Sequence, residues 1–356
     1  MLGPMFDVRA RILSVGTANP PERWRQEDLL DRYRVTDPRL RSLFSSSHIR
    51  TRHLYLPPPG PDGAPQETQG ELLAKHLRGA MEIGPQAVTR CLEPLGLEPR
   101  DIDYLCCITT TGFLAPGLTA HLMRQMGFRE DCSRVDIVGM GCNAGLNGLN
   151  PVTSWARANP GRNALMVSME ICSAAYVFDG TMRTAIVNSL FGDGAAAVLV
   201  RAFEKDARAF APEVVGFNSH IIPAAIDAMR YDWDDTVGKF SFFLDRDIPY
   251  VVGANAERPV ARLLEAHGLK RRHISHWLVH SGGKKVVDAI KYNVGLSDWD
   301  VRHTHSVLRD YGNLSSGSFL FSYERLLREG RVRRGDWGVM MTMGPGSTIE
   351  TALLRW

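Results

Sequence analysis

The segment Val135–Leu146 reads Val-Asp-Ile-Val-Gly-Met-Gly-Cys-Asn-Ala-Gly-Leu. The residues before Gly139 form a short apolar run rich in β-branched side chains, which predicts a buried strand. Apolar residues then recur at helical spacing, beginning with Leu146 and Leu149. Cys142 should therefore lie on a sharp turn between a strand and a helix, at the amino end of that helix.

This position favours a reactive thiol at Cys142. Free backbone N–H groups and the positive end of the helix dipole both stabilise a thiolate. A buried and inert cysteine is the commoner fate of a free thiol, and the turn alone leaves that alternative open.

The same glycines also fit a different motif. Gly139, Gly141 and Ala144 match the dinucleotide-binding fingerprint G-x-G-x-x-G/A, and Glu170 ends the next apolar run. An NAD-dependent dehydrogenase is thus an alternative. Against it, Cys142 occupies a place where the backbone would have to approach a pyrophosphate.

Length and composition restrict the class of protein. A chain of 356 residues predicts two lobes, and 44% hydrophobic with 23% charged residues is typical of a globular protein. A net charge of +3 is too small to indicate nucleic-acid binding. No signal peptide or membrane span is indicated. The six cysteines form no C-x-x-C pair, so we expect no metal site and a cytoplasmic protein.

Two pairs of segments resemble each other at nearly one spacing. Gly96–Ile108 is similar to Gly268–His280, which lies 172 residues later. Gly161–Met169 is similar to Gly335–Met343, which lies 174 residues later. Two matches in the same order indicate an internal duplication, with an alternating strand–helix unit and a mainly parallel sheet in each half.

The duplication predicts where the site lies. We expect halves at residues 1–202 and 203–356, packed face to face. The Cys142 turn would then meet the corresponding turn, Asp310–Gly317, and the end of the strand that carries His280. A dehydrogenase gives no reason for such a repeat.

Two polar residues of the second half complete a candidate set. His280 ends the apolar strand Trp277–Val279 before two glycines, where open α/β sheets place ligands. Asn313 lies in a tight turn before the apolar segment Phe319–Leu327 and could simply cap that helix. Together with Cys142 they make a Cys-His-Asn set.

Such a set supports thioester chemistry. A thiolate attacks a thioester and takes over its acyl group. A histidine N–H and an asparagine amide can both donate to an oxygen on which negative charge develops. This suits the enolate formed when a malonyl thioester loses carbon dioxide, and that enolate can attack the acyl group. A cysteine protease uses the same residue types, but its asparagine orients the histidine and the duplicated fold does not fit.

Several motifs resemble those of one family. They are Gly16–Pro20 (GTANP), Leu190–Ala196 (LFGDGAA), Asp310–Ser316 (DYGNLSS) and Met343–Gly346 (MGPG). Their order is similar to that of the type III polyketide synthases, which belong to the thiolase-fold condensing enzymes. The resemblance implies an α/β, thiolase-like fold with a duplicated, five-layered αβαβα architecture, and a homodimeric acyltransferase.

Three further segments narrow the resemblance: Gly139–Asn147, Asp227–Asp234 and Trp277–Val286. They are similar to bacterial members that make a precursor of glycopeptide antibiotics. This implies malonyl-CoA as starter and extender, a tetraketide closed to 3,5-dihydroxyphenylacetyl-CoA, no cofactor and a crotonase-like accessory protein. Three alternatives remain. The enzyme could make another malonyl-derived product, the chain could be a β-ketoacyl carrier-protein synthase of the initiation type, or it could be an inactive scaffold.

By position, the resemblance makes Cys142 the nucleophile and His280 and Asn313 the oxyanion donors. It makes Phe191 and Phe242 gatekeepers between a CoA tunnel and a cavity. Further candidates for substrate binding are Thr110, Thr111, Cys172, Ser315, Gly344, Pro345 and Gly346. Candidates for CoA binding are the basic residues Arg50, Arg52, Lys284 and Lys285.

Three positions differ from the plant chalcone synthases. Ser281 replaces a proline, Ala115 replaces a methionine and Cys172 replaces a threonine. These differences argue against a bulky aromatic starter and are compatible with malonyl-CoA alone.

Overall fold

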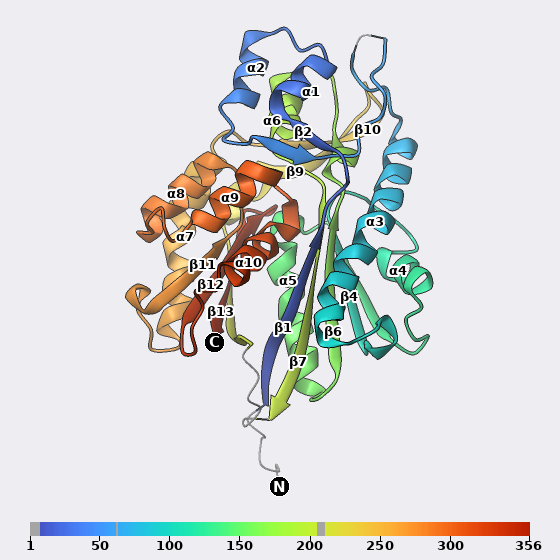
Figure 1. Cartoon of the computed structure of the whole chain (residues 1–356). Coiled ribbons are helices and arrows are strands. Elements are labelled where there is room, and N and C mark those ends of the chain that lie inside the picture. Colours follow the sequence, from blue (N-terminus) through green and yellow to red (C-terminus); the bar gives the residue numbers. More distant parts are fainter. Residues whose placement is uncertain (1–7, 62, 205–210) are drawn as a thin grey trace.

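Strand β6 (Asn163–Glu170) is buried along its whole length in the computed structural model, which describes residues 8–61, 63–204 and 211–356. A strand covered on both faces needs a continuous apolar run, and β6 has one from Ala164 to Val167. This strand lies near the middle of the sheet of the first half (Figure 1).

The sheet of the first half has five strands. Strand β4 runs parallel to both β5 and β6, whereas β7 is antiparallel to β6 and β1 is antiparallel to β7. Across the sheet the order is β5 (Ser133–Val138), β4 (Tyr104–Thr109), β6, β7 (Gly194–Glu204) and β1 (Val8–Ala18).

The described strands of the second half repeat the order and directions of β4, β6, β7 and β1, and the edge strand β5 has no counterpart among them. Strands β11 and β12 are parallel, β13 is antiparallel to β12, and β8 is antiparallel to β13. The order is β11 (Ile274–Val279), β12 (Trp337–Gly344), β13 (Thr348–Arg355) and β8 (Glu213–Ile221). The two half-sheets join through one residue pair, Arg11 with Glu213. The duplication is therefore confirmed, while the boundary between residues 202 and 203 stays a prediction.

Helices fill the remaining three layers (Figure 1). The middle layer is α5 (Ala144–Ala158) with α10 (Ser318–Glu329), and each contacts strands of both half-sheets. Their apolar residues form one buried core with the inner faces of the sheets. The outer layers are α3 (Gln69–Leu92) with α4 (Leu118–Met126), and α7 (Ile248–Glu265) with α8 (Lys284–Val294). This is the five-layered architecture that the family resemblance implies.

A smaller group of elements covers one end of the layers (Figure 1). It consists of two short antiparallel sheets and three helices: β2 (Arg23–Arg25), β3 (Thr51–His53), β9 (Met229–Asp234), β10 (Lys239–Leu244), α1 (Gln26–Arg32), α2 (Pro38–Ser45) and α6 (Met182–Leu190). The remaining helix, α9 (Arg302–Tyr311), packs on α10. None of the helices described here has the length and apolar character needed to cross a membrane.

Candidate active site

Cys142 lies in the turn that the sequence predicts. Strand β5 ends at Val138, a 3-10 turn spans Gly141–Asn143, and α5 follows directly. The prediction that this strand is buried is wrong, because β5 is an edge strand and its residues are partly or fully exposed. Gly139 and Gly141 have φ values of +81° and +74°, a region that side-chain-bearing residues rarely adopt. The glycines are therefore required by the backbone path into Cys142.

The carboxy-terminal loop of the second half packs against this turn. A Cβ on Gly141 would lie 2.0 Å from Cδ of Pro345, and a Cβ on Gly344 would lie 2.7 Å from the backbone nitrogen of Asn143. The turn also contacts the 3-10 turn Ser315–Gly317 of the second half. The two related turns thus meet, as the duplication predicts.

His280 is held at the end of β11. Its backbone N–H donates to the carbonyl oxygen of Met341, at 2.8 Å, which continues the pairing of β11 with β12. The side chain is buried, and Nδ1 has no hydrogen-bond partner in the part of the chain that the structure describes.

Asn313 is fixed by its backbone and by its side-chain oxygen. Its N–H donates to the carbonyl of Leu190 and its carbonyl accepts from the N–H of Gly192, both at 2.9 Å. Its Oδ1 accepts from the N–H of Ser315 at 2.9 Å. Its Nδ2 donates to the carbonyl of Gly282 at 3.5 Å and keeps a second N–H that can turn to a ligand. Asn313 does not cap α10, whose N-cap is Gly317.

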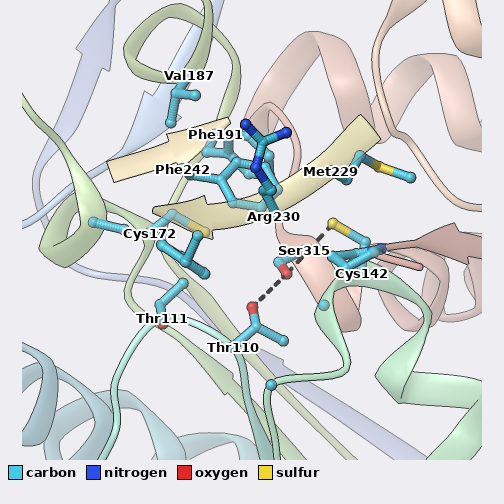
Figure 2. A pocket seen from close by; sticks show the side chains of 15 residues that line it. Thr110, Thr111, Cys142, Cys172, Val187, Phe191, Met229, Arg230, Phe242 and Ser315 are labelled. Atoms are coloured by element: carbon cyan, nitrogen blue, oxygen red, sulfur yellow. Dashed lines mark hydrogen bonds between the residues drawn. The ribbon is translucent and has the colours of Figure 1, made fainter. Parts of the chain in front are cut away.

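Cys142, His280 and Asn313 line one cavity of about 250 Å³, here called the entrance cavity. A second cavity of about 370 Å³, the inner cavity, is also lined by Cys142 (Figure 2). Phe191 and Phe242 line both cavities, with their rings edge to face and their centroids 5.9 Å apart. Cys142 and the two phenylalanines thus stand where the cavities meet.

The inner cavity contains most of the predicted substrate-binding residues: Thr110, Thr111, Cys172, Ser315 and Pro345. Gly344 and Gly346 flank Pro345 without lining either cavity. The sequence reasoning missed Ala175, Val187, Met229, Arg230 and Tyr231. Met229, Arg230 and Tyr231 are the first three residues of β9. They lie within the segment Asp227–Asp234, which the sequence analysis noted only for its family resemblance.

A hydrogen-bond chain leads from Cys142 into the wall of the inner cavity (Figure 2). The Ser315 hydroxyl lies 3.6 Å from Cys142 Sγ and 2.9 Å from Thr110 Oγ1. Thr110 donates to Glu170 at 3.1 Å. Burial raises the pKa of Glu170, which also accepts from Thr111 and Ser316. Glu170 is a further missed residue, and its signal was a carboxylate that ends a buried apolar strand.

Burial outweighs the helix dipole at Cys142. The side chain is only 8% exposed, and desolvation raises its pKa to about 12, although the Ser315 hydroxyl acts in the opposite direction. Burial likewise lowers the pKa of His280 to about 3. The expected thiolate therefore needs a base to accept its proton, and the imidazole of His280 lines the same cavity.

The four basic candidates for CoA binding lie in different places. Lys284 and Lys285 are exposed and line the entrance cavity. Arg50 is exposed but lines neither cavity.

Arg52 requires a correction. It is 0% exposed, and its guanidinium donates to Gln26 Oε1 at 2.7 Å, to Tyr176 Oη at 2.8 Å and to the carbonyl of Phe191 at 2.7 Å. Buried and bound in this way, it cannot reach a phosphate, and it instead ties together the elements that cover the cavities.

No three histidine, cysteine, aspartate or glutamate side chains within residues 8–61, 63–204 and 211–356 gather closely enough to hold a metal ion. The polar groups that face the entrance cavity at Cys142 are a thiol, an imidazole and an amide. This donor set suits acyl transfer.

Sequence comparison agrees with this chemistry. Residues 52–265 match the family model described as "FAE1/Type III polyketide synthase-like protein", and residues 219–356 match "Chalcone and stilbene synthases, C-terminal domain". The chain belongs to the type III polyketide synthases. It is 58% identical to a 3,5-dihydroxyphenylacetyl-CoA synthase of Streptomyces toyocaensis, over 98% of this chain and 90% of the relative. A synthase of the same name from Amycolatopsis orientalis is 58% identical, over 97% and 93%.

Solved structures of type III polyketide synthases share the fold. The crystal structure of PKS-I from the brown alga Ectocarpus siliculosus superposes with a TM-score of 0.92 at 25% identity, and the match covers 98% of each chain. The thiolase-like architecture is therefore confirmed. The dehydrogenase alternative is not supported, because Gly139 and Gly141 serve the turn into Cys142 at the edge strand β5.

Proposed function

We propose that this type III polyketide synthase condenses malonyl-CoA units to a tetraketide and closes it to 3,5-dihydroxyphenylacetyl-CoA. The observation that carries the proposal is the placement of Cys142 between two cavities, with His280 and Asn313 lining the entrance cavity beside it. The two relatives that are 58% identical supply the product class.

The first step loads an acyl group. His280 accepts the proton of Cys142, and the thiolate attacks the thioester carbonyl. The bond from the carbonyl carbon to the CoA sulfur breaks, and CoA leaves as a thiol with the proton from His280. The acyl group is then a thioester of Cys142, and His280 is neutral again.

The second step forms the new carbon–carbon bond. A malonyl thioester in the entrance cavity loses carbon dioxide, and the electron pair of the broken bond becomes an enolate. His280 Nε2–H and Asn313 Nδ2–H donate to the enolate oxygen. The enolate carbon attacks the acyl carbonyl and releases Cys142 as a thiolate, which leaves the extended chain on CoA.

The inner cavity suits a short, flexible chain. Its wall includes the small side chains of Cys172, Ala175 and Val187, and its hydroxyls belong to Thr110, Thr111 and Ser315. The Thr110 and Thr111 hydroxyls donate to Glu170, so the Ser315 hydroxyl is the donor that can bind a carbonyl oxygen of a poly-β-keto chain and bring its carbons into position for aldol closure.

Incubation with malonyl-CoA as the only substrate tests the proposal. We expect 3,5-dihydroxyphenylacetyl-CoA, or its free acid, in a mass-spectrometric analysis of the products. Turnover only after addition of an acyl-carrier protein would indicate a β-ketoacyl synthase instead. A different aromatic product would keep the reaction class and overturn the product.

This chain has an exposed surface to which the second copy of a homodimer could bind. Strand β5 is one of the two edge strands of the nine-stranded sheet, and Phe113, Val138 and Met140 beside it are exposed. We propose that two chains pair across this edge. Sedimentation velocity of wild type and Val138→Asp tests this: the wild type should sediment as a dimer and the variant as a monomer.

We place the reaction in the cytoplasm and in antibiotic biosynthesis. All six cysteines are unpaired, which fits a reducing compartment. The pathway is inferred from the resemblance and from the relatives' names. A crotonase-like accessory protein stays a prediction of the resemblance, and co-purification would test it.

A further inference from the structure

Helix α3 buries a histidine behind the wall of the inner cavity. His76 is 0% exposed, and each ring nitrogen faces a threonine hydroxyl. Nδ1 lies 3.2 Å from Thr111 Oγ1, and Nε2 lies 3.3 Å from Thr109 Oγ1. Thr111 lines the inner cavity, so His76 is one hydrogen bond away from it.

The position of this ring is built into the backbone. A Cβ on Gly112 would lie 2.1 Å from Cδ2 of His76, so the imidazole occupies space that only a glycine at position 112 leaves free. Burial lowers the pKa of His76 to about 4. The ring is therefore neutral near neutral pH and carries one N–H.

Hydrogen-bond counting assigns that N–H to Nδ1. Thr111 Oγ1 accepts from the N–H of Ile171 at 2.9 Å and donates its only proton to Glu170 Oε2 at 3.1 Å. In the contact between Thr111 and His76, the ring must then be the donor. With the proton on Nδ1, Nε2 is an acceptor for the Thr109 hydroxyl.

The same counting continues on the other side of Glu170. Thr110 donates its hydroxyl proton to this carboxylate, so in the contact of 2.9 Å between Thr110 and Ser315 the donor is Ser315. The Ser315 proton can point either to Thr110 or to Cys142 Sγ. Ser315 is therefore the hydroxyl of this chain whose proton remains available beside Cys142.

We propose that His76 is a positioning residue that acts through Thr111 and Glu170. Its Nδ1–H holds the Thr111 hydroxyl toward the carboxylate, which fixes the orientation of Thr111 in the wall of the inner cavity. The growing chain then meets one orientation of this wall, and that orientation selects the folding that leads to ring closure. The inference rests on the proposed function.

Three variants of His76 test this assignment. An asparagine amide can place a donor near the position of Nδ1, a glutamine amide reaches the position of Nε2, and leucine supplies neither. With malonyl-CoA, we expect His76→Asn to keep the wild-type ratio of aromatic product to open-chain and lactone products. His76→Gln and His76→Leu should lower that ratio about fivefold, the effect of one lost hydrogen bond.

Release of carbon dioxide from malonyl-CoA is the internal control. It depends on Cys142, His280 and Asn313. The rate should stay within about twofold of wild type in all three His76 variants, because the hydrogen bonds of those three residues remain intact. A purely structural role for His76 would lower decarboxylation, product ratio and melting temperature together. The proposal is overturned if His76→Leu keeps the wild-type ratio or if the asparagine and leucine variants behave alike.

Thr111→Val breaks the same link from the other side, which protects the test against misfolding of a His76 variant. It should lower the ratio as His76→Leu does, and the double variant should add nothing further. An unchanged ratio in Thr111→Val would also overturn the proposal. If the wild type releases carbon dioxide but forms no aromatic product, the proposed product fails, and the ratio among the remaining products still reports on His76.

Discussion

The backbone of Gly141 lies directly against the ring of Pro345, where a Cβ at position 141 would come within 2.0 Å of the proline Cδ. Gly141 begins the turn that carries Cys142, and Pro345 follows the last residue of β12 in the other half. This contact therefore joins the two halves at the site and fixes the position of the turn that carries Cys142.

Gly141→Ala should damage both stability and activity. The substitution places a side chain at φ +74° and against Pro345, so we expect a backbone cost of about 1–2 kcal/mol and an overpacking cost of about 1–3 kcal/mol. Gly139→Ala is the matched control, because it has φ +81° and no atom within 4 Å of its Cβ. Chemical denaturation should separate the two variants, and equal losses would show that the contact with Pro345 is unimportant.

The pH dependence of Cys142 should depend on His280. Burial is the main reason that the pKa of this thiol is raised to about 12, and burial lowers the pKa of the imidazole to about 3, which leaves both groups neutral. Transfer of the proton creates two opposite charges that stabilise each other, so the pair ionises at lower pH than the thiol would alone.

Alkylation of Cys142 by iodoacetamide should therefore reach its plateau well below pH 12 in the wild type. In His280→Gln the midpoint should move upward toward the value of the isolated buried thiol. Cys142→Ala provides the background from the other cysteines. The same midpoint in wild type and His280→Gln would remove His280 as the base.

Asn313→Asp should slow decarboxylation. The substitution replaces a donor by a negative charge beside the enolate, and loss of one oxyanion donor costs about 10²–10³-fold in rate. Release of carbon dioxide from malonyl-CoA measures this step. Because Asn313 Oδ1 also accepts from the N–H of Ser315, the aspartate keeps that contact and the fold of the turn. Near-normal release would contradict the role of the amide.

Lys285→Ala should weaken the binding of CoA without slowing the chemistry. Lys285 is an exposed cation at the entrance cavity, and its attraction to the phosphates of CoA is screened by salt. We expect a severalfold higher KM for malonyl-CoA and an unchanged kcat. Malonyl-pantetheine, which carries no phosphate, is the control substrate. A similar rise of its KM would show that the lysine does not bind phosphate.

Cys142, His280 and Asn313 could be located from the sequence because each lies at the end of an element with a local signal. The apolar strand before the glycines, the strand before His280 and the turn around Asn313 are all readable within about ten residues of each site residue. The internal repeat then brought these distant segments together, and the topology of the two half-sheets agrees with it.

Arg52 and Glu170 show where such reasoning fails. Arg52 belongs to a basic cluster, which is typical of a solvated surface, yet contacts with Gln26, Tyr176 and Phe191 bury it. In the sequence, Glu170 was noted only as part of a dinucleotide fingerprint. The hydroxyls that donate to it come from segments far away in the sequence, so no local pattern indicates its partners. Burial and partners across the sequence cannot be predicted from local pattern.

Identification of the acylated residue tests the central claim most directly. After brief reaction with malonyl-CoA and digestion, mass spectrometry should find the acyl adduct on the peptide with Cys142, in wild type and in Cys172→Ser. Cys142→Ala should carry no adduct and form no product. An adduct on Cys172, or product formation by Cys142→Ala, would contradict the account.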